Sequence, residues 1–175
     1  MDKIQILFVV LFLLNLLLLW AAILSARFLW YRFAGYLLLL LIPLLTVWFE
    51  QPRFELDYYW WKWAGLASIL MGLALGYWAI RELKKARDEW YSILPTMLVK
   101  SGPYQYLRHP VYLSLIFIWI GWWWLWAAAY SFYFGMLMLG LLWLHGYCEE
   151  KWVLEKHYGQ IYVEYRQKTG MFWVK

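Results

Sequence analysis

The chain has 175 residues, of which 65% are hydrophobic and 15% are charged, and its formal net charge is +5. These polar residues are too few to cover the surface of a soluble globular protein. The composition therefore excludes a soluble protein and predicts an integral membrane protein. The positive charge suits anionic lipid head groups beside membrane helices, whereas a nucleic-acid binder needs a dedicated basic face for which this chain has no room. We therefore expect membrane lipids, and no nucleic acid, as partners.

Hydrophobic runs predict an all-α bundle, because a helix needs about 20 apolar residues to cross roughly 30 Å of hydrocarbon. The block from Val111 to Tyr147 has no charged residue and is too long for one span, so we expect a hairpin of two helices that turns near its Trp-rich middle. The single cysteine, Cys148, excludes a disulfide within the chain. We predict one domain, residues 1–175, with five transmembrane helices at residues 4–24, 31–49, 61–80, 111–126 and 129–147 and a cytosolic helical segment at the C-terminus.

The basic residues are shared unevenly between the two sides of this predicted topology. Of the 16 Lys and Arg residues, only Lys3, Arg53 and Lys62 fall on one side. The positive-inside rule assigns the other side to the cytoplasm, with the N-terminus outside. Aromatic residues at positions 58–63 and 122–126 then lie at the outer interface, where amphipathic rings gather. No small-residue cleavage pattern follows the first run, so we expect an anchor and not a signal peptide.

Most of the polar residues fall in two cytosolic segments, residues 81–110 and 148–175. The predicted hairpin leaves the cytosolic side and returns to it, so these segments should meet at one end of the bundle. A site can form there.

The first cytosolic segment contains two turns. One is Ser101-Gly-Pro-Tyr, and the other is His109-Pro110, where proline suits the first turn of a helix. Arg108, His109 and Tyr112 are then held at a helix N-terminus, which favours an anionic group. A purely structural alternative is that Arg108 contacts lipid phosphate and His109 caps the helix.

The second cytosolic segment begins with Glu149 and Glu150 at the end of the fifth span, where carboxylates are costly unless they are paired or used. Gly159 should end that helix, and Tyr162 and Tyr165 should line one side of the next. The alternative is an amphipathic helix on the membrane surface. Three histidines give no closed ligand set, so no metal is expected.

Together the two segments resemble a known family. They are similar to the isoprenylcysteine carboxyl methyltransferase family and its prokaryotic relatives. Four features carry the similarity, in this order: the string from Leu98 to Tyr112, a hydrophobic hairpin, Glu149-Glu150-Lys-Trp-Val-Leu, and Tyr158-Gly-Gln-Ile-Tyr-Val-Glu-Tyr. The resemblance runs from Gly76 onward. It implies S-adenosylmethionine in a pocket closed by the C-terminal segment, and methyl transfer at the cytoplasmic face to a lipophilic substrate that enters from the bilayer.

The resemblance also implies roles for single residues. Three form the cofactor wall (Val99, Gly102 and Tyr104), two bind the methionine part (His109 and Tyr112), and Tyr162 also contacts the cofactor. Glu149 or Glu150 holds the ammonium group, and Arg108 suits a carboxylate. Catalytic roles fall to Glu150 and to Arg166 or Lys168, which would orient the substrate. The family commonly has Arg-Val-Pro after the last tyrosine, where this chain has Lys168-Thr169-Gly170.

Two alternatives remain open at this point. Membrane sterol reductases also carry Arg-His-Pro-x-Tyr and bind NADPH, but two adjacent glutamates repel the phosphates of a dinucleotide. A non-catalytic scaffold or lipid-binding protein would explain the hydrophobic runs and not the meeting of acidic and basic groups.

Overall fold

The computed structural model describes residues 6, 9–10, 12–14, 16–17, 20, 29–55, 59–86, 94–173 and 175. Within these ranges the elements are helical, and no strand forms beyond two isolated bridges. The all-α prediction is confirmed. The elements are α2 (Leu29–Leu45), η1 (Thr46–Trp48), α3 (Trp60–Lys85), η2 (Gly102–Gln105), α4 (Pro110–Trp126), α5 (Ala129–Glu149), η3 (Glu150–Leu154), α6 (Glu155–Tyr158) and α7 (Gln160–Lys168). Most of the predicted first span lies outside the described residues. So do four residues that the topology prediction used, namely Lys3, Arg27, Tyr58 and Arg87.

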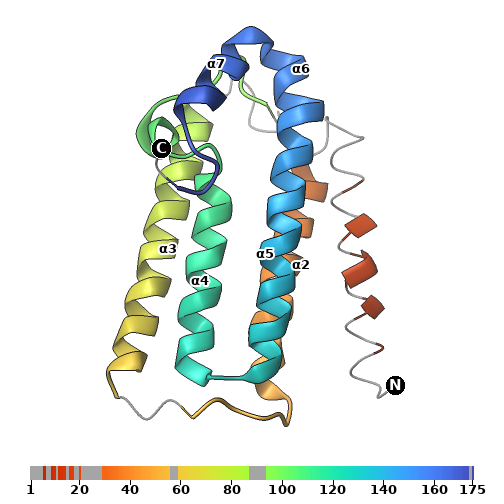
Figure 1. The fold of residues 1–175 in the computed structure, drawn as a ribbon, viewed down its shortest axis with the longest axis vertical. Coiled ribbons are helices and arrows are strands. Elements are labelled where there is room, and N and C mark those ends of the chain that lie inside the picture. Colours follow the sequence, from red (N-terminus) through yellow and green to blue (C-terminus); the bar gives the residue numbers. More distant parts are fainter. Residues whose placement is uncertain are drawn as a thin grey trace.

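Helices α2 to α5 run side by side along the long axis of the molecule (Figure 1). The predicted hairpin is confirmed, because α4 ends at Trp126, Ala127 takes a left-handed φ of 50°, and α5 starts at Ala129. Pro110 starts α4 as predicted, with His109 at its N-cap. The α3–α4 connection and α7 therefore lie at the same end of the bundle, opposite the hairpin turn (Figure 1).

Two helices of the described residues are long and apolar enough to cross a membrane, namely Trp60–Lys85 and the continuous helix Ala129–Tyr158. They contain the predicted spans 61–80 and 129–147. Two shorter apolar helices, Ala34–Trp48 and Pro110–Trp126, correspond to the predicted spans 31–49 and 111–126. The number of spans stays a prediction.

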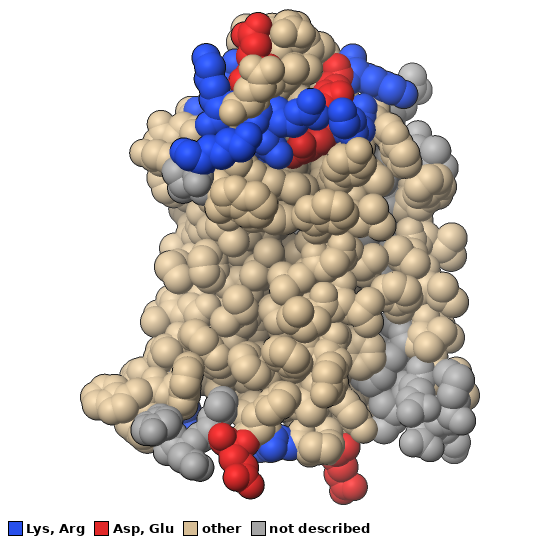
Figure 2. Space-filling model, in the orientation of Figure 1, with Lys and Arg blue, Asp and Glu red and all other residues tan. Residues whose placement is uncertain are grey.

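Charged residues gather at the two ends of the bundle, and the face shown in Figure 2 carries a broad uncharged band between them. The end with the α3–α4 connection and α7 is rich in exposed basic residues, which are Arg81, Lys84, Lys85, Lys100, Lys156, Lys168 and Lys175. At the opposite end Trp61 of α3 and Trp124 of α4 pack with ring centroids 5.3 Å apart. This distribution matches the predicted separation of basic and aromatic residues.

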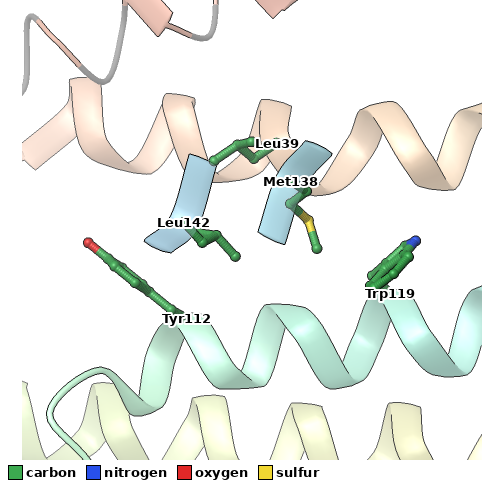
Figure 3. Close-up of a cluster of buried hydrophobic side chains, with 5 residues drawn as sticks. All are labelled: Leu39, Tyr112, Trp119, Met138 and Leu142. Atoms are coloured by element: carbon green, nitrogen blue, oxygen red, sulfur yellow. The ribbon is translucent and has the colours of Figure 1, made fainter. Parts of the chain in front are cut away.

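The bundle is packed by one apolar cluster and one close helix pair. Leu39 of α2, Met138 and Leu142 of α5, and Tyr112 and Trp119 of α4 are buried together (Figure 3). Between α3 and α4, glycines let the two backbones approach, as small residues do in membrane bundles. A Cβ atom added at Gly121 would lie 2.3 Å from the carbonyl oxygen of Gly65.

We expect Gly121→Ala to lower the free energy of unfolding by about 1–3 kcal/mol, since overpacking forces backbones apart. Two of the three nearest atoms, Gly65 O and Ile69 N, are backbone atoms of α3, which cannot rotate away. Thermal unfolding in detergent measures the effect. Gly140→Ala in α5 is the matched control, because a Cβ at Gly140 meets nothing within 4 Å. Equal stability of the two variants would contradict the α3–α4 contact.

Candidate active site

The two cytosolic segments predicted to meet are in direct contact. Leu107 and Gly170 form an isolated parallel β-bridge. The backbone N–H of Arg108 donates to the carbonyl of Gly170 at 2.9 Å. The Tyr165 hydroxyl of α7 donates to the carbonyl of Tyr104 at 2.5 Å. The chain after α7 therefore folds back along the residues that precede α4.

Glu150 forms the centre of a buried ionic cluster. Its Oε1 atom accepts hydrogen bonds from Arg108 Nε at 2.8 Å and from His109 Nε2 at 2.9 Å. All three side chains are at least nine-tenths buried. Charge-assisted hydrogen bonds are the strong kind, so this cluster fixes η3 against the start of α4. The anionic group that the sequence predicted near Arg108 and His109 is, in this structure, the carboxylate of Glu150.

Arg108 also binds the C-terminal segment. Its Nη1 atom donates to the carbonyl of Arg166 at 2.9 Å and to the carbonyl of Thr169 at 2.6 Å. One guanidinium group thus joins η3, the end of α7 and the start of α4, which the planar fork of arginine permits and a lysine ammonium does not.

A second polar network continues from Glu149 into the bundle. Glu149 Oε2 accepts a hydrogen bond from the Tyr112 hydroxyl at 2.5 Å. That hydroxyl also lies 2.8 Å from His145 Nδ1 and 2.5 Å from the hydroxyl of Tyr36 in α2. Tyr36 and His145 are 3.2 Å apart. The sequence did not indicate Tyr36 as a site residue, and it offered His145 only as one of three histidines that give no closed set of metal ligands.

The two glutamates reach separate partners, because adjacent residues of a helix point to different sides. Helix α5 ends at Glu149, and the five residues from Glu150 form the π-helical turn η3 before α6 continues the same rod. A π-turn inserts an extra residue per turn, and such turns are frequent at functional sites. Both carboxylates are buried, with 8% and 4% of their surface exposed.

Tyr162 and Tyr165 line the buried side of α7, as the sequence predicted. Burial, and then the negative charge of Glu150, raises the pKa of Tyr162 far above its ordinary value. Burial likewise raises the pKa of Tyr165, so that this hydroxyl keeps the proton that it donates to Tyr104. The Tyr162 hydroxyl is buried and interacts with the Glu150 carboxylate.

Comparison with known proteins decides the family. The model of the phospholipid methyltransferase family matches residues 60–161, which include α3, α4, α5 and both glutamates. The chain belongs to the phospholipid methyltransferase family. It is therefore a membrane methyltransferase of the kind that its motifs resemble. No curated protein and no solved structure matches the chain.

The family match begins earlier than the resemblance read from the motifs and ends at the second residue of α7. Three residues with expected roles lie beyond it, namely Tyr162, Arg166 and Lys168. Arg166 forms an ion pair with Glu155 of α6, and Lys168 is exposed. The structure thus places neither cation in the buried cluster of Glu150.

The expected cofactor wall packs against the end of α3. Val99 and Tyr104 are buried with Ala79. Gly102 has a φ of 58°, and a Cβ there would lie 2.7 Å from Glu82 Cγ, so no larger residue fits. The Ser101 hydroxyl donates to Glu82 at 2.9 Å. These contacts fix the loop that leads to Arg108.

No cluster of three or more metal-ligating side chains forms among the residues that the structure describes. His145 is buried in the bundle, whereas His157 is exposed on α6 with its ring against Tyr158. His145 therefore belongs to the network of Tyr112 and Glu149.

Proposed function

We propose that the protein transfers the methyl group of S-adenosylmethionine to a lipophilic acceptor that enters from the bilayer. In this proposal the chain is a single five-span domain with its N-terminus outside, and the site lies at the cytoplasmic face. The observation that carries the proposal is the buried meeting of two glutamates with Arg108, His109 and Tyr112 at the basic end of the bundle. The family membership supports the reaction class.

The donor set fits the amino-acid part of this cofactor, which carries one ammonium and one carboxylate. Glu149 or Glu150 would hold the ammonium, and Arg108, His109 and Tyr112 would hold the carboxylate. The buried Tyr162 hydroxyl, which lies beside Glu150, offers one more donor. The loop residues Val99, Gly102 and Tyr104 would form the wall beside it.

When bound, the cofactor supplies an electrophilic methyl group on a positively charged sulfonium. The protein's contribution is positioning, and exclusion of water by the buried carboxylates and tyrosines. The two glutamates provide negative charge where a cation must be held. Direct transfer to the acceptor needs no enzyme nucleophile. Arg166 and Lys168 remain candidates for orienting an anionic acceptor, such as an isoprenylcysteine carboxylate, and the family description points equally to phospholipids.

The proposal is tested by calorimetry of the detergent-purified protein against S-adenosylhomocysteine and against NADPH. We expect binding of S-adenosylhomocysteine and none of NADPH, since the paired glutamates repel phosphates. His109→Asn should weaken binding by about tenfold, because one charge-assisted hydrogen bond is lost. His157→Asn is the matched control, since His157 is exposed. Binding of NADPH alone would point to the reductase, and binding of neither ligand to a non-catalytic lipid-binding protein.

A further inference from the structure

The buried histidine at the end of α5 has no role in the proposed binding of the cofactor. His145 is 3% exposed, and its Nδ1 atom lies 2.8 Å from the Tyr112 hydroxyl. Its ring packs edge-on against Tyr36, with centroids 5.5 Å apart. Tyr36 and Tyr112 in turn pack on the apolar cluster of Leu39 and Leu142. A group that exchanges protons is therefore held away from water and connected to the site by a hydroxyl.

The two glutamates have different neighbours. Glu150 receives its hydrogen bonds from Arg108 and His109, which favour its charged form. Glu149 receives a hydrogen bond from the Tyr112 hydroxyl, while the nearest His109 nitrogen is 4.0 Å away. Adjacent acids in unlike surroundings commonly divide their roles, one staying charged and the other exchanging a proton.

We propose that, with Glu150 as the glutamate that holds the cofactor ammonium, Glu149, Tyr112 and His145 form a proton path that takes the proton from an ammonium group of the acceptor. This inference rests on the proposed methyl transfer, and it concerns acceptors that carry an amine. Such an amine is protonated near neutral pH and has no lone pair for a new bond until the proton leaves. A carboxylate acceptor needs no such path.

The transfer balances in two steps. The ammonium gives its proton to the Glu149 carboxylate, which becomes a carboxylic acid and leaves a neutral amine. Glu149 then gives a proton to the Tyr112 oxygen as the Tyr112 hydroxyl proton moves to His145 Nδ1. The carboxylate and the tyrosine are restored, and His145 holds the proton and its positive charge during methyl transfer. After the product leaves, the proton returns through Tyr112 to Glu149 and from there to the reopened site. Tyr36, 3.2 Å from the same nitrogen, positions the ring.

Other titratable and charged groups face this path. They are Arg108 and His109 before α4, Glu150 in η3 and Tyr162 in α7. A purely structural role, in which the network only joins α2, α4 and α5, would reduce activity equally at every pH. A proton path makes a different prediction.

The test compares His145→Asn with the wild-type protein in vesicles that contain phosphatidylethanolamine as the amine acceptor. Asparagine keeps a hydrogen-bonding atom near the Nδ1 position and takes up no proton. We expect kcat to fall at least about tenfold at about pH 6.5, and by less than about threefold near pH 9, where more of the amine is already neutral. S-adenosylhomocysteine affinity should stay within about twofold of the wild type, as for the His157→Asn control.

Tyr36→Phe gives a second variant that removes one hydroxyl and keeps the ring. It should show a smaller loss with the same pH dependence. A third measurement does not use activity, since the chain has three histidines and labelled imidazole signals can be assigned by substitution. Glu149→Gln should move the titration of the His145 signal and leave that of His157 unchanged.

A loss of kcat that is equal at both pH values would overturn the proton path, and so would an unmoved His145 signal. Methylation of a prenylated cysteine carboxylate with none of phosphatidylethanolamine would overturn it while the proposed function stands. Failure of the wild-type protein to bind S-adenosylhomocysteine would instead contradict the proposed function itself.

Discussion

Glu150→Gln is expected to weaken S-adenosylhomocysteine binding at least about 100-fold, a loss of about 2.7 kcal/mol. The amide has nearly the same shape as the carboxylate and carries no charge. It therefore removes both the anion available to a ligand ammonium and the anion that holds Arg108 and His109. Isothermal titration calorimetry on the purified protein measures the affinity.

The same substitution should also lower the free energy of unfolding by about 3 kcal/mol, because a buried cation loses its partner. Thermal unfolding separates this effect from the loss of binding. Glu164→Gln is the matched control, since Glu164 lies exposed on α7. A folded Glu150→Gln protein that binds S-adenosylhomocysteine as well as the control would remove Glu150 from the site.

Local signals in the sequence predicted some helix ends. Pro110 fixes the start of α4, and Gly159, with a φ of 57°, ends the helix that contains Glu149. The uncharged block longer than one span predicted the hairpin that α4 and α5 form. These features depend on residues that are neighbours in the chain, so the sequence alone is sufficient.

The partners inside the bundle could not be predicted in the same way. Tyr36 and His145 are 109 positions apart and meet only because α2 packs on α5. Hydrophobic periodicity marks the apolar face of a helix, but these helices are apolar on every side, so it does not show which faces meet. The π-turn that begins at Glu150 has no sequence signature either, and no local pattern shows which partners the two adjacent glutamates reach.

The sequence identified the right residues of the ionic cluster and missed how they pair. Arg108 and Glu150 were each expected to bind part of a cofactor. In the structure they bind one another, and Arg108 in addition holds the carbonyls of Arg166 and Thr169. Backbone carbonyls as partners leave no trace in the amino-acid sequence, because every residue has one.

Arg108→Lys is expected to release the C-terminal segment while the charge is kept. Lysine replaces a planar fork with a single flexible ammonium, which cannot reach Glu150, Arg166 and Thr169 together. We expect the free energy of unfolding to fall by about 2–4 kcal/mol as two or more buried hydrogen bonds are lost. Hydrogen exchange should rise at the amides of Arg108 and His109, which donate to Gly170 and Met171.

Arg81→Lys is the matched control, because it makes the same replacement of arginine by lysine at the same end of the bundle. Arg81 lies exposed on α3. If charge alone held the segment, both variants would keep the amides of Arg108 and His109 protected. Faster exchange confined to Arg108→Lys would show that the guanidinium geometry closes α7 over the glutamates. Closure of the site would then depend on one arginine that contacts three segments of the chain, and the cofactor affinity should fall with it.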